Sequence, residues 1–152
     1  MLSLVLLLGA CAGGGAAAPN GRVATLPEGA AAGLLRQCSR SAPPMGESTW
    51  HPTAQDVALL ERQLPAALAA APEARGEDFS GLLLRWRRQY VGLVRGGRRF
   101  VYGNFLPGGP GDGEARWRTE PTIVCDGGPQ FFGVEFDQAS GRITHLAFNG
   151  SM

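Results

Sequence analysis

The chain has 152 residues, 44% of them apolar, and a formal net charge of +1 at pH 7. This length allows one domain of ordinary size with a real hydrophobic core. The apolar content excludes global disorder, and the near-neutral charge excludes binding to a polyanion by bulk charge alone. All fourteen basic residues are arginine, which we interpret as a compositional bias rather than as evidence about function.

An apolar run, Leu2–Leu8, opens the chain and is followed directly by Gly9, Ala10 and Cys11. The run is far shorter than the roughly 20 residues that span a bilayer as a helix. The segment Leu8–Cys11 resembles the lipobox of bacterial lipoproteins, in which cleavage leaves the cysteine at the N-terminus with a diacylglyceryl group on its sulfur. The usual positively charged residues before the run are missing. An ordinary signal peptide or a buried apolar helix is the alternative interpretation.

The resemblance implies that Cys11 is lipidated and that a lipid anchor holds the chain in the bacterial cell envelope, facing the periplasm. In lipoproteins of enteric bacteria an aspartate after the cysteine is a retention signal for the inner membrane. Ala12 in this position favours the outer membrane. Residues 12–22 are mainly Gly and Ala and are predicted to form a flexible tether, which leaves residues 23–152 as a single α+β domain. Nucleic acid is not an expected partner of such a protein.

The two remaining cysteines, Cys38 and Cys125, are candidates for a disulfide in an exported chain. The bond would close a loop of about 88 residues and contribute roughly 4 kcal/mol on loop-entropy grounds. Two free buried thiols are the alternative. We expect no metal site, because neither cysteine has a C-x-x-C partner, and no cofactor.

The clearest predicted helix begins at Thr53 and continues to Ala71. Thr53 and Asp56 form a T-x-x-D pair that is typical of a capping box. Pro65 is expected to kink the helix or to mark a restart. One apolar stripe at helical spacing is formed by Val57, Leu60, Leu64 and Leu68.

Two β-hairpins are predicted in the second half of the chain. The first joins Tyr90–Val94 to Phe100–Leu106 through Gly96-Gly97, and the second joins Pro129–Asp137 to Arg142–Phe148. Three shorter elements are also expected: a helix over Ala30–Gln37, a helix from Ser80 to about Trp86, and a third strand over Glu120–Cys125.

The second hairpin shows the alternation of a half-buried strand. Its first strand places Phe132, Val134 and Phe136 on one face and Gly133, Glu135 and Asp137 on the other. Its second strand is predicted to place Thr144, Leu146 and Phe148 on one face and Ile143, His145 and Ala147 on the other.

The glycines inside the predicted strands, Gly92, Gly103 and Gly133, suggest a bent sheet. The predicted fold is therefore α+β, with an N-terminal amphipathic helix packed on a curved antiparallel sheet of four to five strands. This layout resembles the cystatin-like or NTF2-like arrangement. Fold alone does not determine function.

No nucleophile elbow, zinc-protease motif or phosphate-binding loop is present in the sequence, and we assign no catalytic residue. A small enzyme or ligand-pocket protein remains an alternative. It would use His145 with Asp126, Glu135 or Asp137, and these side chains would have to converge on one concave pocket.

The strongest candidate for binding is a cluster of arginines interleaved with aromatic residues: Arg85, Trp86, Arg87, Arg88, Tyr90, Arg95, Arg98, Arg99 and Phe100. Such side chains hold anionic groups through bidentate and cation–π contacts. The predicted binding residues are Arg88, Tyr90, Arg95, Arg98 and Arg99. Arginines that protect a sheet edge are the alternative.

Four short segments resemble small uncharacterised secreted proteins of bacteria: Arg88–Gly92, Tyr102–Phe105, Cys125–Phe132 and Asn149-Gly150. The resemblance implies no established activity. The sequence therefore favours a non-enzymatic envelope lipoprotein that binds a protein or an anionic envelope component, with a purely structural lipoprotein as a further possibility.

Overall fold

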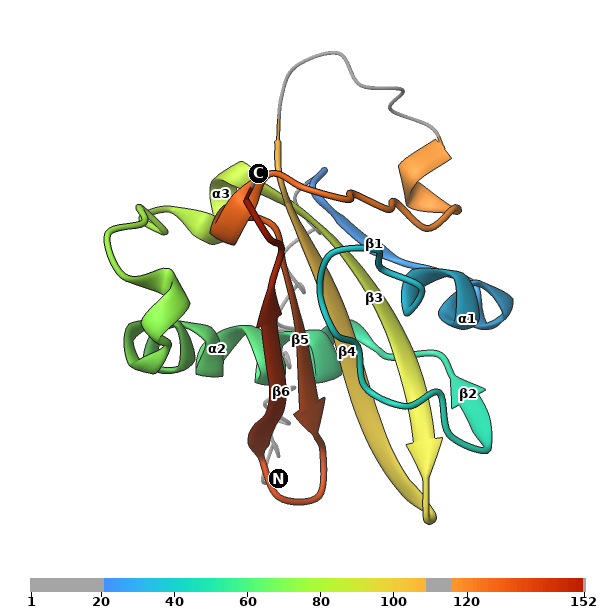
Figure 1. Cartoon of the computed structure of the whole chain (residues 1–152). Helices are drawn as coiled ribbons and strands as arrows, with labels where there is room; N and C mark the ends of the chain where they lie inside the picture. The colour runs from blue at the N-terminus through green and yellow to red at the C-terminus, as the bar shows by residue number, and fades with distance from the viewer. Residues whose placement is uncertain (1–20, 109–115, 152) are drawn as a thin grey trace, which may run out of the picture.

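The computed structural model describes residues 21–108 and 116–151, so the predicted lipobox and most of the predicted tether lie outside the described residues. In chain order the elements are β1 (Val23–Thr25), α1 (Ala31–Leu34), β2 (Ser48–Trp50), α2 (Ala54–Ala70), α3 (Leu82–Arg85), β3 (Trp86–Arg95), β4 (Arg98–Pro107), β5 (Phe132–Asp137) and β6 (Arg142–Phe148). Short 3-10 turns are formed by Glu28–Ala30, Pro72–Ala74, Arg116–Arg118 and Gly128–Gln130. The fold class is α+β (Figure 1).

The sheet is mixed and contains six strands in the order β1-β3-β4-β5-β6, with β2 also paired to β3. The predicted hairpins form its centre, β3 with β4 and β5 with β6. β1 runs parallel to the first half of β3, whereas β2 runs antiparallel to the second half. The prediction of an antiparallel sheet of four to five strands is therefore wrong, since the sheet has six strands and β1 is parallel to β3. β1 and β2 have three residues each, which is too short to show a periodic pattern in the sequence.

The long helix α2 covers one face of the sheet, behind the strands in Figure 1. Its capping box is present: the Thr53 hydroxyl accepts a hydrogen bond from the Asp56 backbone N–H, and an Asp56 carboxylate oxygen accepts one from the Thr53 N–H. Pro65 lies inside the helix. The helix does not precede the whole sheet as predicted, since β1 and β2 come before it. Its buried side chains are Val57, Leu60, Leu64 and Leu68.

The opposite face of the sheet is covered by α1 and by residues 35–47, which we call the strap (Figure 1). The strap is held by the Cys38–Cys125 disulfide, which confirms the prediction for this pair. It also contacts the sheet where His145 Nε2 lies 3.1 Å from the Ser41 carbonyl oxygen. As a result β5 is buried on both faces, not half-buried as its alternation predicts.

The segment Glu120–Cys125 is not the predicted third strand. Buried side-chain amides form hydrogen bonds with its backbone N–H and carbonyl groups. In a strand, the backbone of a neighbouring strand would form these hydrogen bonds. Gln89 Oε1 accepts from the Thr122 N–H at 2.9 Å, and Asn104 Nδ2 donates to the Thr122 carbonyl at 3.0 Å. Asn149 Nδ2 donates to the Val124 and Asp126 carbonyls.

A register shift in the β5–β6 pair reverses part of the predicted face assignment. Glu135 pairs with His145 but Phe136 pairs with Ile143, so Thr144 is the extra residue of a bulge. Ile143 therefore packs against the α2-side core, and Thr144 donates a hydrogen bond to Glu135 instead.

Candidate functional site

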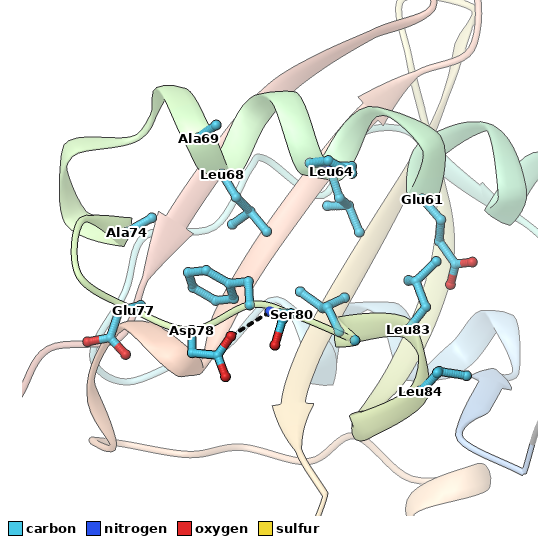
Figure 2. Close-up of a pocket in the computed structure, with 14 residues that line it drawn as sticks. Glu61, Leu64, Leu68, Ala69, Ala74, Glu77, Asp78, Ser80, Leu83 and Leu84 are labelled. Atoms are coloured by element: carbon cyan, nitrogen blue, oxygen red, sulfur yellow. Dashed lines mark hydrogen bonds between the residues drawn. The ribbon is translucent and has the colours of Figure 1, made fainter.

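An open groove of about 680 Å³ lies between α2 and the chain segment that leads into β3 (Figure 2). One wall is the α2 side that carries Glu61, Leu64 and Leu68; the other is residues 77–84. The full lining is Glu61, Leu64, Pro65, Leu68, Ala69, Ala74, Glu77, Asp78, Phe79, Ser80, Gly81, Leu82, Leu83 and Leu84.

The apolar character of the groove follows from how its two walls fold. Leu64 and Leu68 belong to the buried stripe of α2, and they point toward the segment that carries Ser80 and Leu83 (Figure 2). Gly81 adopts a left-handed conformation (φ +60°) and starts α3, a turn that presents leucines on successive positions. Leu84 is 74% exposed and Leu83 is 37% exposed, so this turn adds accessible apolar surface to the groove.

The groove is acidic at its edges. Three carboxylates line it; no arginine does, although Asp78 pairs with Arg85 and Glu61 pairs with Arg88 just outside the lining. Hydrogen bonds from Ser80, together with Arg85, lower the pKa of Asp78 to about 2, so this group is ionised at neutral pH. Glu77 accepts a hydrogen bond from the Gln130 side chain at 3.2 Å. The geometry favours a ligand with an apolar body and a positive charge.

The third carboxylate, Glu61, connects the groove to the core. Its Oε1 lies 3.3 Å from Arg88 Nε and accepts a hydrogen bond from the Tyr90 hydroxyl at 2.7 Å. Arg88 and Tyr90 are 1% and 0% exposed, and Arg88 also donates to the Leu83 carbonyl. Burial, and the nearby Glu61, raise the pKa of Tyr90 well above its ordinary value.

The arginines predicted as one binding surface are separated by the length of the hairpin. Ten residues of strand span about 33 Å, so Arg95, Arg98 and Arg99 lie at the hairpin tip, far from Arg85 and Arg87. Arg88 and Tyr90 are buried under α2 between the two ends.

At the hairpin tip the arginines are engaged within the molecule. Arg95 pairs with Glu135 at 2.6 Å, donates to the Pro44 carbonyl and stacks on the Phe100 ring. Arg98 pairs with Asp137. Arg99 lies over the Trp50 ring, 5.0 Å from its centroid.

Two carboxylates that an enzyme site was predicted to use, Glu135 and Asp137, are also engaged in contacts within the molecule. Burial alone would raise the pKa of Asp137, but hydrogen bonds from Ser140 and Ala139 and the charge of Arg98 outweigh it and lower the pKa. Glu135 is held by Arg95 and Thr144. None of His145, Asp126, Glu135 and Asp137 lines the groove.

The sequence predicts neither the groove nor the burial of Arg40. Arg40 is 8% exposed and donates to the side-chain oxygens of Asn104 and Asn149. The run Leu82–Leu84 next to Arg85 was the one available signal of an exposed apolar turn.

Within residues 21–108 and 116–151, no three His, Cys, Asp or Glu side chains are grouped so that they could hold a metal ion. In the same part of the chain, no helix has the length and apolar content needed to cross a membrane. In comparisons with known proteins, no family model, no curated protein and no solved structure matches this chain.

Proposed function

We propose that this chain is a non-enzymatic binding module of the bacterial cell envelope, and that the groove beside α2 binds a peptide segment of a partner protein. The segment would carry apolar side chains flanked by lysine or arginine. A lipid on Cys11 would tether the module, facing the periplasm and in the outer membrane. The observation that carries the proposal is a leucine-lined groove with acidic edges.

Charge decides between the two ligand classes that the sequence favours. An anionic ligand in the groove would face Glu77 and Asp78; the ion pair of Asp78 with Arg85 at 3.1 Å is exposed on both sides, and Arg85 itself does not line the groove. A cationic peptide would place its charge beside these groups while its apolar side chains contact Leu64, Leu68 and Leu83. This arrangement is the helix-in-groove or extended-peptide type of recognition, in which a few apolar anchors supply most of the affinity.

The arginine hairpin is a weaker candidate for the same role. Arg95 and Arg98 already neutralise the buried Glu135 and Asp137, so an external anion would have to compete with these ion pairs. The alternative of a small enzyme is disfavoured for a different reason. The four side chains that it would use lie outside the groove: His145, Asp126, Glu135 and Asp137. The proposed cystatin-like or NTF2-like layout is supported by a long helix packed across a hairpin-based sheet.

The test is a fluorescence-anisotropy titration with two labelled peptides. Both carry the same leucine-rich body; one is flanked by lysines and the other by glutamates. The groove is blocked by Ala69→Trp, which adds a large ring at an exposed lining position of α2. The matched control is Ala70→Trp, an exposed position on the same helix that does not line the groove.

We expect the lysine-flanked peptide to bind the wild-type chain and the Ala70→Trp chain equally. Ala69→Trp should weaken binding about tenfold or more, the loss expected when roughly 1.4 kcal/mol of apolar contact is removed. The glutamate-flanked peptide should bind more weakly to every chain. Equal binding of both peptides, or equal binding by Ala69→Trp and wild type, would contradict the proposal and favour a purely structural lipoprotein.

A further inference from the structure

The two walls of the groove belong to one continuous stretch of chain. α2 forms the first wall and ends at Ala70, and residues 77–84 form the second wall. Residues 71–76 connect the two walls tightly: the Ala74 N–H donates to the Ala71 carbonyl, and the Glu77 N–H donates to the Ala74 carbonyl. At this end of the groove the chain itself therefore fixes the distance between the walls.

A buried arginine joins the walls at the other end, where Figure 2 shows Glu61 and Leu83. Arg88 Nε lies 3.3 Å from Glu61 Oε1 on α2, and Arg88 Nη1 donates a hydrogen bond to the Leu83 carbonyl at 2.6 Å. A guanidinium group carries donors that point in several directions in one plane. The side chain of Arg88 therefore contacts both walls at once.

The sheet holds Arg88 in place. At this position β3 is paired on both sides, with Val23 of β1 and Phe105 of β4. Arg88 is 1% exposed. Tyr90, two residues further along the same strand, donates to the Glu61 carboxylate at 2.7 Å. The points at which α2 and the second wall are held are thus both fixed relative to the centre of the sheet.

Stability alone does not explain a buried charge pair at this position. Taking two charges out of water is costly, and a well-packed apolar pair of similar volume often gives equal or greater stability. An apolar pair would not set a distance between α2 and the Leu83 carbonyl, because apolar contacts are not directional. The pair of Arg88 and Glu61 can do so.

We propose that Arg88 is a latch that fixes the spacing between the two walls and keeps the groove preformed for its peptide. The inference rests on the proposed function and adds a positioning residue to it, since Arg88 does not line the groove and acts through Glu61 and Leu83. Without the latch, residues 79–84 would open away from α2 as a local unit. A ligand would then have to order this wall on binding, which lowers its affinity.

The first measurement is amide hydrogen exchange of the full chain without a ligand. The test variant is Arg88→Met. Glu61→Gln/Arg88→Met also removes the remaining buried carboxylate charge, and it keeps the test possible if the single change prevents folding. The control is Gly133→Ala, a destabilising change on the strap side of the sheet, where a Cβ would lie close to Arg40.

Two amides report on the second wall: those of Leu82 and Leu84, which donate to the Phe79 and Gly81 carbonyls. In both latch variants they should exchange at least about tenfold faster than in wild type, the change expected when a hydrogen bond to a charged group is lost. Gly133→Ala should leave their exchange unchanged. Unchanged exchange in the latch variants, or the same acceleration in Gly133→Ala, would overturn the proposal.

The second measurement is the affinity for the lysine-flanked peptide, for which position and charge predict opposite results. Arg88→Met removes a positive charge beside Glu61, so an arginine that acts only through its charge would give tighter binding in this variant. Loss of the latch should instead weaken binding about fivefold or more. Gly133→Ala should bind like wild type.

Equal or tighter binding by Arg88→Met would overturn the role of the latch in binding. If wild type binds neither peptide, the proposed function is rejected, and the exchange of the Leu82 and Leu84 amides still decides whether Arg88 holds the second wall. If wild type binds the lysine-flanked peptide and Arg88→Met changes neither exchange nor affinity, only the latch is rejected.

Discussion

Alkaline pH should destabilise this protein through its two tyrosines, Tyr90 and Tyr102, both 0% exposed. Burial raises the pKa of Tyr90 well above 10, and Glu61 raises it further while Arg88 partly opposes. Burial also raises the pKa of Tyr102, with Arg40 opposing. The chain has no lysine and arginine does not titrate below pH 12, so tyrosine protons dominate this pH range.

The sign of the effect follows from proton binding. Above pH 10 the unfolded chain loses its tyrosine protons while the folded chain keeps them, so the free energy of unfolding falls as the pH rises. One pH unit above the unfolded pKa, a single tyrosine lowers the free energy of unfolding by about 1.4 kcal/mol. We expect Tyr90 to account for about this much loss between pH 9 and pH 11, and Tyr102 for up to the same amount.

The assay is urea unfolding of the disulfide-bonded protein from pH 7 to pH 11, for wild type, Tyr90→Phe, Tyr102→Phe and the double variant. In each single variant the free energy of unfolding should fall less steeply between pH 9 and pH 11 than in wild type. In the double variant it should hardly fall at all. At pH 7, Tyr90→Phe should cost about 1 kcal/mol, because Glu61 loses a hydrogen bond. A double variant that declines as steeply as wild type would refute the reasoning.

Three other buried features of the fold contribute to its stability: an ion pair, the disulfide and a close-packed glycine. Glu61→Ala should cost about 3–5 kcal/mol in urea unfolding because it leaves Arg88 buried without its carboxylate; adding Arg88→Met should recover part of this loss, and no recovery would show that the ion pair is not the cause. Replacing Cys38 and Cys125 by serine should cost roughly 4 kcal/mol at constant pH, whereas a loss below about 1 kcal/mol would mean that the strap is held by its other contacts. Gly133→Ala should lower stability by about 1–3 kcal/mol, because a Cβ at this position would overlap the buried Tyr102 hydroxyl; an unchanged urea midpoint would contradict this packing.

The elements that could be predicted are those whose signal lies in local sequence. The cap at Thr53 and the stripe from Val57 to Leu68 specify α2 within one stretch of chain. The Gly96-Gly97 turn specifies the β3–β4 hairpin, with both glycines at positive φ. The disulfide was predictable by counting cysteines, since only one pairing remains if Cys11 is lipidated.

The elements that could not be predicted depend on distant partners. β1 is three residues long and exists because β3 offers an edge to Val23–Thr25. The segment around Thr122 has the β-branched composition of a strand, but amides from Gln89 and Asn104 occupy its backbone groups. No local pattern distinguishes these two outcomes.

The candidate site is harder still to predict, because sequence shows charge but not burial. Arg88 and Arg95 look alike as members of one arginine-rich stretch. The strand period places Arg88 beneath α2 against Glu61 and Arg95 on the other face against Glu135. The groove forms between α2 and a turn near Leu83, and the two walls come together only in the tertiary structure.

We propose that the functional surface of this protein is the groove beside α2 rather than the arginine hairpin. The most direct measurement is a titration of the ¹⁵N-labelled chain with the lysine-flanked peptide, followed by backbone amide chemical shifts. We predict saturable shifts concentrated at residues 66–69 and 77–84, with the amides of residues 95–99 unchanged. Shifts concentrated at residues 95–99, or no saturable shift anywhere, would contradict the claim.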